Sequence, residues 1–225
     1  MTDVSAADWM VEEVGEFGSG VKGLLPSRFE AYARILHPGG EEGELAPALL
    51  SALCEVLAPY TSTADHCWFC LWEGWGWIPG SPSVALLGGP ATDLMLGPAF
   101  PPEIMNGPRV RLPARDYILF EGPLDAATEM DGRLGDQVAA ANPGIDLAAH
   151  GLADEFTPQS PNLFWPEDQA WCVATEIDLD STYVGGSQAL AESIVRDGRF
   201  EALAAQLDDR IDRAGDEINP SPPDQ

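Results

Sequence analysis

The chain has 225 residues, 45 % of them hydrophobic, and its 37 aspartates and glutamates against 11 lysines and arginines give a net charge of −26. The length suits one domain with a full hydrophobic core, and the composition excludes disorder throughout. Such an acidic surface repels phosphates, which excludes nucleic acid and anionic membranes as partners. A cationic protein partner or a small ligand fits this charge.

The location that we expect is the cytoplasm. The acidic N-terminus lacks the basic and apolar zones of a signal peptide. No apolar run reaches the roughly 18 residues that a membrane span needs. The four cysteines are therefore expected to be reduced.

The first third of the chain reads as helical. Residues 1–20 form an N-terminal extension with a short helix around 6–14. Ser27 and Glu30 match a capping box, which predicts a helix that runs to Leu36 and stops at the following proline and glycines. A second helix is predicted over 45–57 from the spacing of its leucines.

Strands dominate the middle of the chain. "HCWFCLWEGWGW", residues 66–77, has aromatic and apolar residues at both parities, which is typical of a strand buried on both faces. Weaker strand patterns follow at 82–87, 109–113 and 116–123. Residues 88–108 read as a loop, and 124–129 as a helical turn.

The last part of the chain contains one long irregular segment and two clear elements. Residues 131–159 are predicted to form a surface insertion. "WCVATEI", residues 171–177, predicts a strand, and Ser187 predicts the N-cap of a last helix. Residues 208–225 read as an acidic disordered tail.

Together these patterns predict an α+β protein. We expect a single domain over residues 21–207, with an antiparallel or mixed sheet of about five strands and flanking helices, because strands gather in the middle and helices lie at both ends.

The run "EIDLDSTYVGGS", residues 176–187, is the strongest candidate for chemistry. On an extended strand Glu176, Asp178 and Asp180 would share one face, where their oxygens could bind Mg²⁺ or Ca²⁺. The simpler interpretation is a strand with a polar outer face, a glycine turn and a capped helix. The same run resembles the D-x-D-x-T motif of haloacid-dehalogenase-like phosphatases, but that family needs a later lysine, and no lysine follows Thr182.

Two further groups of residues are candidates for ligand or partner contact. Trp75 and Trp77 alternate with glycines at the end of the 66–77 run, just beyond the strand, and could line a groove, although packing in the core or a loop is an alternative. Arg109 and Arg111 would share a strand face, where they could pair with the 171–180 strand or bind an anion.

The Cys67–Cys70 pair has the spacing of a zinc or redox motif, but no second such pair exists in the chain. In a strand the two side chains would point to opposite faces. We therefore expect these cysteines to be buried and reduced, without a cofactor.

Four longer blocks carry a resemblance to a family. They are "RFEAYARILHP", "CWFCLWEGWGW", "RDYILFEGPL" and "QSPNLFWPEDQAWCVATEIDLDSTYVGGS". They cover about half of the chain and resemble an uncharacterised family of actinobacterial hypothetical proteins. The resemblance implies a bacterial cytoplasmic protein and implies no catalytic residues.

Two functions fit the sequence. The first is a non-enzymatic binding domain for a cationic protein or a small ligand, which the acidic surface would attract. The alternative is a metal-assisted hydrolase that uses Glu176, Asp178 and Asp180, with Mg²⁺ or Ca²⁺ as its cofactor.

Overall fold

The computed structural model describes residues 3–40, 42–80, 94–132, 134–150 and 157–211. Its α-helices are α1 (Asp8–Glu13), α2 (Pro47–Leu57), α3 (Pro102–Met105), α4 (Leu134–Ala141) and α5 (Gln188–Arg196). Its 3₁₀ helices are η1 (Ser5–Ala7), η2 (Val21–Gly23), η3 (Pro38–Gly40), η4 (Ala58–Tyr60), η5 (Leu124–Glu129) and η6 (Ala148–His150). Its strands are β1 (Ala31–Leu36), β2 (Cys67–Trp72), β3 (Val110–Arg111), β4 (Asp116–Gly122), β5 (Asp131–Gly132), β6 (Thr157–Pro158), β7 (Leu163–Pro166), β8 (Cys172–Thr175), β9 (Ser181–Gly186) and β10 (Ala202–Ala205).

One antiparallel sheet organises the molecule. Its eight strands follow the order β10-β1-β9-β8-β7-β2-β4-β3, and every neighbouring pair is antiparallel. The predicted mixture of helices and an antiparallel sheet is confirmed, but the prediction of about five strands was wrong. The sequence analysis assigned no strands to β1, β7, β9 and β10.

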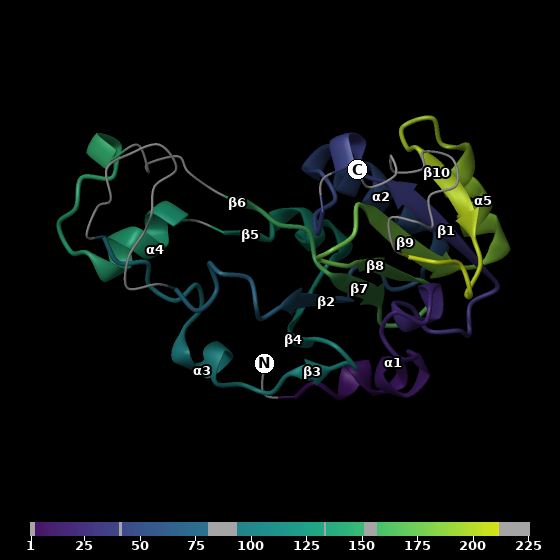
Figure 1. Cartoon of the computed structure of the whole chain (residues 1–225), viewed down its shortest axis with the longest axis horizontal. Coiled ribbons are helices and arrows are strands. Elements are labelled where there is room, and N and C mark those ends of the chain that lie inside the picture. The colour runs from purple at the N-terminus through teal and green to yellow at the C-terminus, as the bar shows by residue number, and fades with distance from the viewer. Residues whose placement is uncertain (1–2, 41, 81–93, 133, 151–156, 212–225) are drawn as a thin grey trace, which may run out of the picture.

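Helices cover both faces of this sheet (Figure 1). On one face α2 and α5 pack on a cluster that includes Phe164, Val173 and Val184. On the other face α1 and η2 pack on a cluster that includes Trp165 and Tyr183. The central strands are therefore buried on both faces, which explains the apolar residues at both parities in β2, β7 and β8.

The predicted helix over residues 27–36 was wrong, because residues 31–36 form strand β1 between β9 and β10. Ala33 and Ile35 face the α2 side and are fully buried, whereas Tyr32 faces the α1 side. Glu30, the expected partner of the Ser27 cap, instead accepts a hydrogen bond from the first N–H of α5, on Gln188 (3.1 Å). Strand pairing with residues 145 to 173 positions away in the chain thus outweighs a local helix signal.

The double glycine Gly185-Gly186 lies in strand β9 and does not form the expected turn. A Cβ atom on Gly185 would lie 2.5 Å from the Phe29 ring, and one on Gly186 would lie 2.7 Å from Leu190 Cδ2. Because the glycines have no Cβ atoms, Phe29, which precedes β1, and Leu190 of α5 can pack directly on the backbone of β9.

Several predicted elements are present. The helix over 45–57 appears as α2, and the strands over 66–77, 109–113 and 116–123 appear as β2, β3 and β4. The helical turn over 124–129 is η5. The predicted strand over 82–87 lies outside the described residues.

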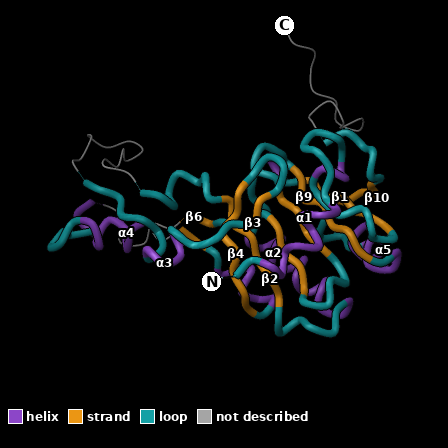
Figure 2. The backbone as a smooth tube through the Cα atoms, turned by 90° about the horizontal axis from the view of Figure 1, so that it is seen from below, coloured by secondary structure: helices purple, strands orange, loops and turns teal. Residues whose placement is uncertain are grey.

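A smaller lobe with α3 and α4 projects beyond the β2–β4 side of the sheet in both views (Figures 1 and 2). The two-stranded ribbon β5–β6 lies at its base. Val138 is buried there against Leu94, Leu96, Ile145 and Leu147. Among the described helices, none is both long and apolar enough to cross a membrane.

Candidate functional site

The three carboxylates of the 176–187 run do not share a strand face. Strand β8 ends at Thr175 and β9 begins at Ser181, so residues 176–180 form the loop between them. Glu176 points into the protein with 5 % of its side chain exposed, whereas the Asp178 side chain is 69 % exposed. The expected alternation of carboxylates on one strand face was therefore wrong, because strand β8 stops at Thr175, before the first of the three carboxylates.

Arginines bind these carboxylates. The Arg115 guanidinium donates from Nε to Glu176 Oε1 (2.9 Å) and from Nη2 to Asp178 Oδ2 (2.6 Å). Asp180 lies 3.6 Å from a guanidinium nitrogen of Arg34. Burial disfavours the charged form of Arg115, but the hydrogen bonds and charges of Glu176 and Asp178 together outweigh this and raise the arginine pKa.

This arrangement does not fit the predicted metal site. Among the residues that the structure describes, no group of three His, Cys, Asp or Glu side chains could hold a metal ion. Glu176 and Asp178 already face the same cation, Arg115, and Asp180 faces a different one. A divalent ion would have to displace Arg115 to reach the first two carboxylates.

The predicted pairing of Arg109 and Arg111 with the 171–180 strand was also wrong. Strand β3 lies at the sheet edge, and β4, β2 and β7 separate it from β8. Arg109 binds Glu73 (2.7 Å) and donates to backbone carbonyls at the end of α3, including that of Met105 (2.6 Å). Arg111 is mostly exposed and lies 3.7 Å from Asp116 of the neighbouring strand.

The two tryptophans beyond β2 are half-buried. Trp75 donates through Nε1 to Asn162 Oδ1 (3.2 Å) and packs edge-on against Trp72. Trp77 packs near Phe100. Both rings contact the small cluster of Leu71, Ile78 and Ile118, so packing accounts for their positions.

The cysteines are buried and unpaired, in agreement with the sequence analysis. Cys67 packs on the α2 side of the sheet and Cys70 on the α1 side, as expected for positions three apart in a strand. Burial raises the pKa of Cys67 to about 12 and that of Cys70 well above its usual range. Both are therefore thiols at neutral pH.

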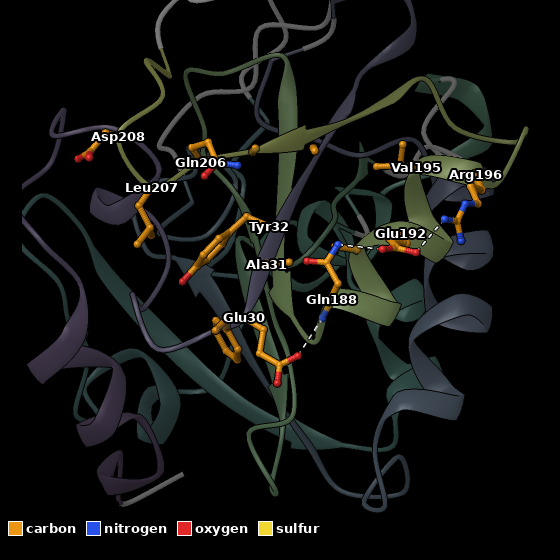
Figure 3. Close-up of a pocket in the computed structure, with 14 residues that line it drawn as sticks. Glu30, Ala31, Tyr32, Gln188, Glu192, Val195, Arg196, Gln206, Leu207 and Asp208 are labelled. Atoms are coloured by element: carbon orange, nitrogen blue, oxygen red, sulfur yellow. Dashed lines mark hydrogen bonds and ion pairs between the residues drawn. The ribbon is translucent and has the colours of Figure 1, made fainter.

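The structure contains a groove that the sequence analysis missed. It has a volume of about 680 Å³ and lies where β10 diverges from β1, beside α5. We call it the edge groove. Its lining comes from residues 29–32, from residues 204–208, and from Gln188, Ala191, Glu192, Val195 and Arg196 of α5. Figure 3 shows Glu30 and Tyr32 on one side of this groove and the side chains of α5 on the other.

The lining of the edge groove includes three carboxylates but only one arginine, Arg196. Glu30 binds the N-terminus of α5, and Glu192 accepts hydrogen bonds from Gln188 (3.0 Å) and Arg196 (2.8 Å). The Gln188 hydrogen bond, followed by the charge of Arg196, lowers the pKa of Glu192, which is therefore ionised at neutral pH. Asp208 lies 2.6 Å from Lys22, which is outside the lining.

Local sequence places the α5 wall of this groove. Ser187 caps the helix by accepting from the Leu190 N–H (3.2 Å). Leu190, Ala191 and Ile194 are buried against the core, and the neighbouring helix face, with Glu192 and Val195 beside Ala191, lines the groove. This amphipathic pattern was the only sequence signal for the groove, since its other two walls required the unpredicted strands β1 and β10.

Comparisons with protein-family models, with curated proteins and with solved structures give no significant match. The actinobacterial resemblance therefore stays a prediction, and the function must be argued from the geometry of this chain.

Proposed function

We propose that this protein is a non-enzymatic binding domain that takes up a cationic segment of a partner protein in the edge groove. The observation that carries the proposal is the groove itself, a hollow of about 680 Å³ bordered by Glu30, Glu192 and Asp208. Four alanines, Ala31, Ala191, Ala204 and Ala205, contribute to its lining, and their small side chains let a peptide backbone approach closely.

The charge of the whole molecule supports the same partner. A net charge of −26 creates a long-range field that attracts cations and speeds their encounter with the surface. At the groove, lysine or arginine side chains of the partner would find carboxylates that are already ionised, as the lowered pKa of Glu192 indicates.

The metal-assisted hydrolase is the less favoured function. It requires Glu176 and Asp178 to bind a cation other than Arg115, which holds both at 2.6–2.9 Å. In the edge groove Glu192 and Asp208 also have cationic partners, Arg196 and Lys22, but these pairs lie at the surface, with 42 % of the Glu192 side chain and 84 % of the Asp208 side chain exposed, so a partner's cations can reach them.

Binding of a labelled oligolysine peptide tests the proposal by fluorescence anisotropy at low salt. The variant E30Q/E192Q removes two groove charges but keeps an oxygen that can accept the hydrogen bonds from Gln188. The control E103Q/E129Q removes the same charge from exposed positions outside the groove lining.

We expect the groove variant to weaken binding about fivefold or more, and the control to change it by less than about twofold, because close charges contribute more than distant, screened ones. Equal weakening by both variants would show that only net charge attracts the peptide and would refute the edge groove as the site.

A further inference from the structure

Strand β10 ends the main sheet at the edge groove. It pairs with β1 on one side, and no described strand pairs with its other side. The views in Figures 1 and 2 place β10 at the end of the sheet, next to α5. The opposite edge strand, β3, has only two residues.

The hydrogen bonds of β1 show which groups of β10 point outward. The N–H of His37 donates to the carbonyl of Asp180, the residue before β9, and the N–H of Leu36 donates to the carbonyl of Glu201, the residue before β10. In an antiparallel ladder both backbone groups of a residue point to the same side, and the side alternates along the strand. Odd-numbered residues of β1 therefore bond to β9, and even-numbered ones to β10.

The register carries this alternation into β10. Tyr32 lies opposite Ala205 and Arg34 opposite Leu203, so Ala205 and Leu203 use their backbone groups on β1. The N–H and C=O groups of Ala202 and Ala204 must then point to the outer edge. One residue further on, the N–H of Gln206 is bound by the Asp209 carboxylate (2.7 Å), so the outward edge ends at Ala204.

Strand β10 is a short edge strand of four residues beside α5, and its own sequence carries none of the chemical protections of an edge strand. Its sequence is Ala-Leu-Ala-Ala, without lysine, proline or an inward-pointing charge. Ala204 is exposed and belongs to the lining of the edge groove. Within the described part of the chain, the alanine side chains of β10 itself place no large group beside the backbone of this edge.

We propose that an extended cationic segment of a partner protein adds to the sheet as a ninth strand, by pairing with Ala202 and Ala204. This inference rests on the proposed function and specifies how the segment binds. Ala202 and Ala204 lie opposite Ile35 and Ala33, whose side chains face α5. Alternate side chains of the added strand point to the same face, where Glu192 borders the groove.

The charge decides between this occupant and a second copy of the chain. Two copies joined edge to edge would bring together two molecules of net charge −26, each with Glu30, Glu192 and Asp208 near the contact. Like charges oppose that association, whereas a segment with lysine or arginine at alternate positions is attracted.

The test uses a labelled peptide of about seven residues in which lysine alternates with threonine or valine, the pattern of strand addition. Amide hydrogen exchange of the full chain is measured by NMR with and without this peptide. We expect the amides of Ala202 and Ala204 to become protected on binding, while those of Leu203 and Ala205 are protected from the start.

The variant A204P removes the backbone N–H of residue 204, which points to the outer edge. The hydrogen bonds between β10 and β1 do not involve that N–H. We expect it to weaken peptide binding about tenfold, as one lost backbone hydrogen bond with a steric clash predicts. A204V keeps the N–H and is the matched control. Thermal unfolding of both variants checks that they are folded. If A204P does not fold, the exchange measurement on the unmodified chain still tests strand addition.

The outcomes separate the two proposals. Strand addition is overturned if E30Q/E192Q weakens peptide binding, but the peptide does not change amide exchange at Ala202 and Ala204 and A204P does not change the affinity. The proposal that the edge groove binds a cationic segment would then still stand. If the unmodified chain does not bind the peptide at low salt, both proposals fail. If Ala202 and Ala204 become protected at high protein concentration without peptide, the occupant is a second copy and the partner segment is overturned.

Discussion

Replacement of Arg115 by methionine tests whether the carboxylates of residues 176–180 are structural. Arg115 lies between the rings of Phe17 and Trp72, at 5.5 and 5.2 Å from their centroids. Its guanidinium binds Glu176 and Asp178. Methionine keeps much of the side-chain length and apolar contact but removes the charge.

The expected loss follows from the burial of Glu176. Its side chain is 5 % exposed, and in the variant the carboxylate retains one described donor, the N–H of Asp178 (2.7 Å). An ion pair broken from one side at a buried position costs about 3–5 kcal/mol. Arg115 is itself 19 % exposed, and water can reach the space that it leaves, so we expect about 2–4 kcal/mol.

Urea unfolding followed by far-UV circular dichroism measures this loss. D178N is the matched control, because Asp178 is 69 % exposed and its pair should contribute less than about 1 kcal/mol. The double variant R115M/E176Q removes both charges and should recover part of the stability. A free energy of unfolding for R115M within about 0.5 kcal/mol of that for D178N would refute the buried ion pair as a structural element.

Two further predictions concern stability. S187A removes the acceptor of the Leu190 N–H and should lower the free energy of unfolding by about 1 kcal/mol, whereas S187D should not; equal stability of S187A and the unmodified chain would contradict the cap. Burial raises the pKa of Cys54 and of Cys67 to about 12, so each contributes stability that is complete below the unfolded thiol pKa of about 8.5 and is lost as pH rises toward 12. The free energy of unfolding, measured in urea between pH 8 and 11, should therefore fall less steeply with pH in C54A/C67A than in the unmodified chain. Parallel plots of this free energy against pH would argue against buried thiols.

The sequence correctly predicted elements whose signals are local or very apolar. The leucine spacing of α2 and the cap of α5 are contained within each helix. β2 and β8 were recognised because strands buried on both faces need apolar residues at every position. The strongly acidic composition, on which the proposed partner depends, is likewise visible in the sequence alone.

Residues 31–36 show why other elements were mispredicted. Their local pattern, with a capping-box serine and helix-compatible side chains, favours a helix, but β1 lies between β9 and β10 and satisfies its backbone groups with them. The Glu176–Asp180 run was mispredicted for a related reason: the loop begins where pairing of β8 with β9 ends, a point that no residue of the run marks by itself.

The edge groove could not be predicted from the sequence, because it exists only in the tertiary structure. Its walls come from residues 29–32, 188–196 and 204–208, which meet because β10 returns antiparallel along β1 while α5 crosses beside them. Hydrophobic spacing reports which face of one element is buried, whereas hydrogen-bond partners across a sheet belong to segments far apart in the chain. The sequence therefore determined the charge of this protein and the helices α1, α2 and α5, and the packing of distant strands decided where that charge borders a groove.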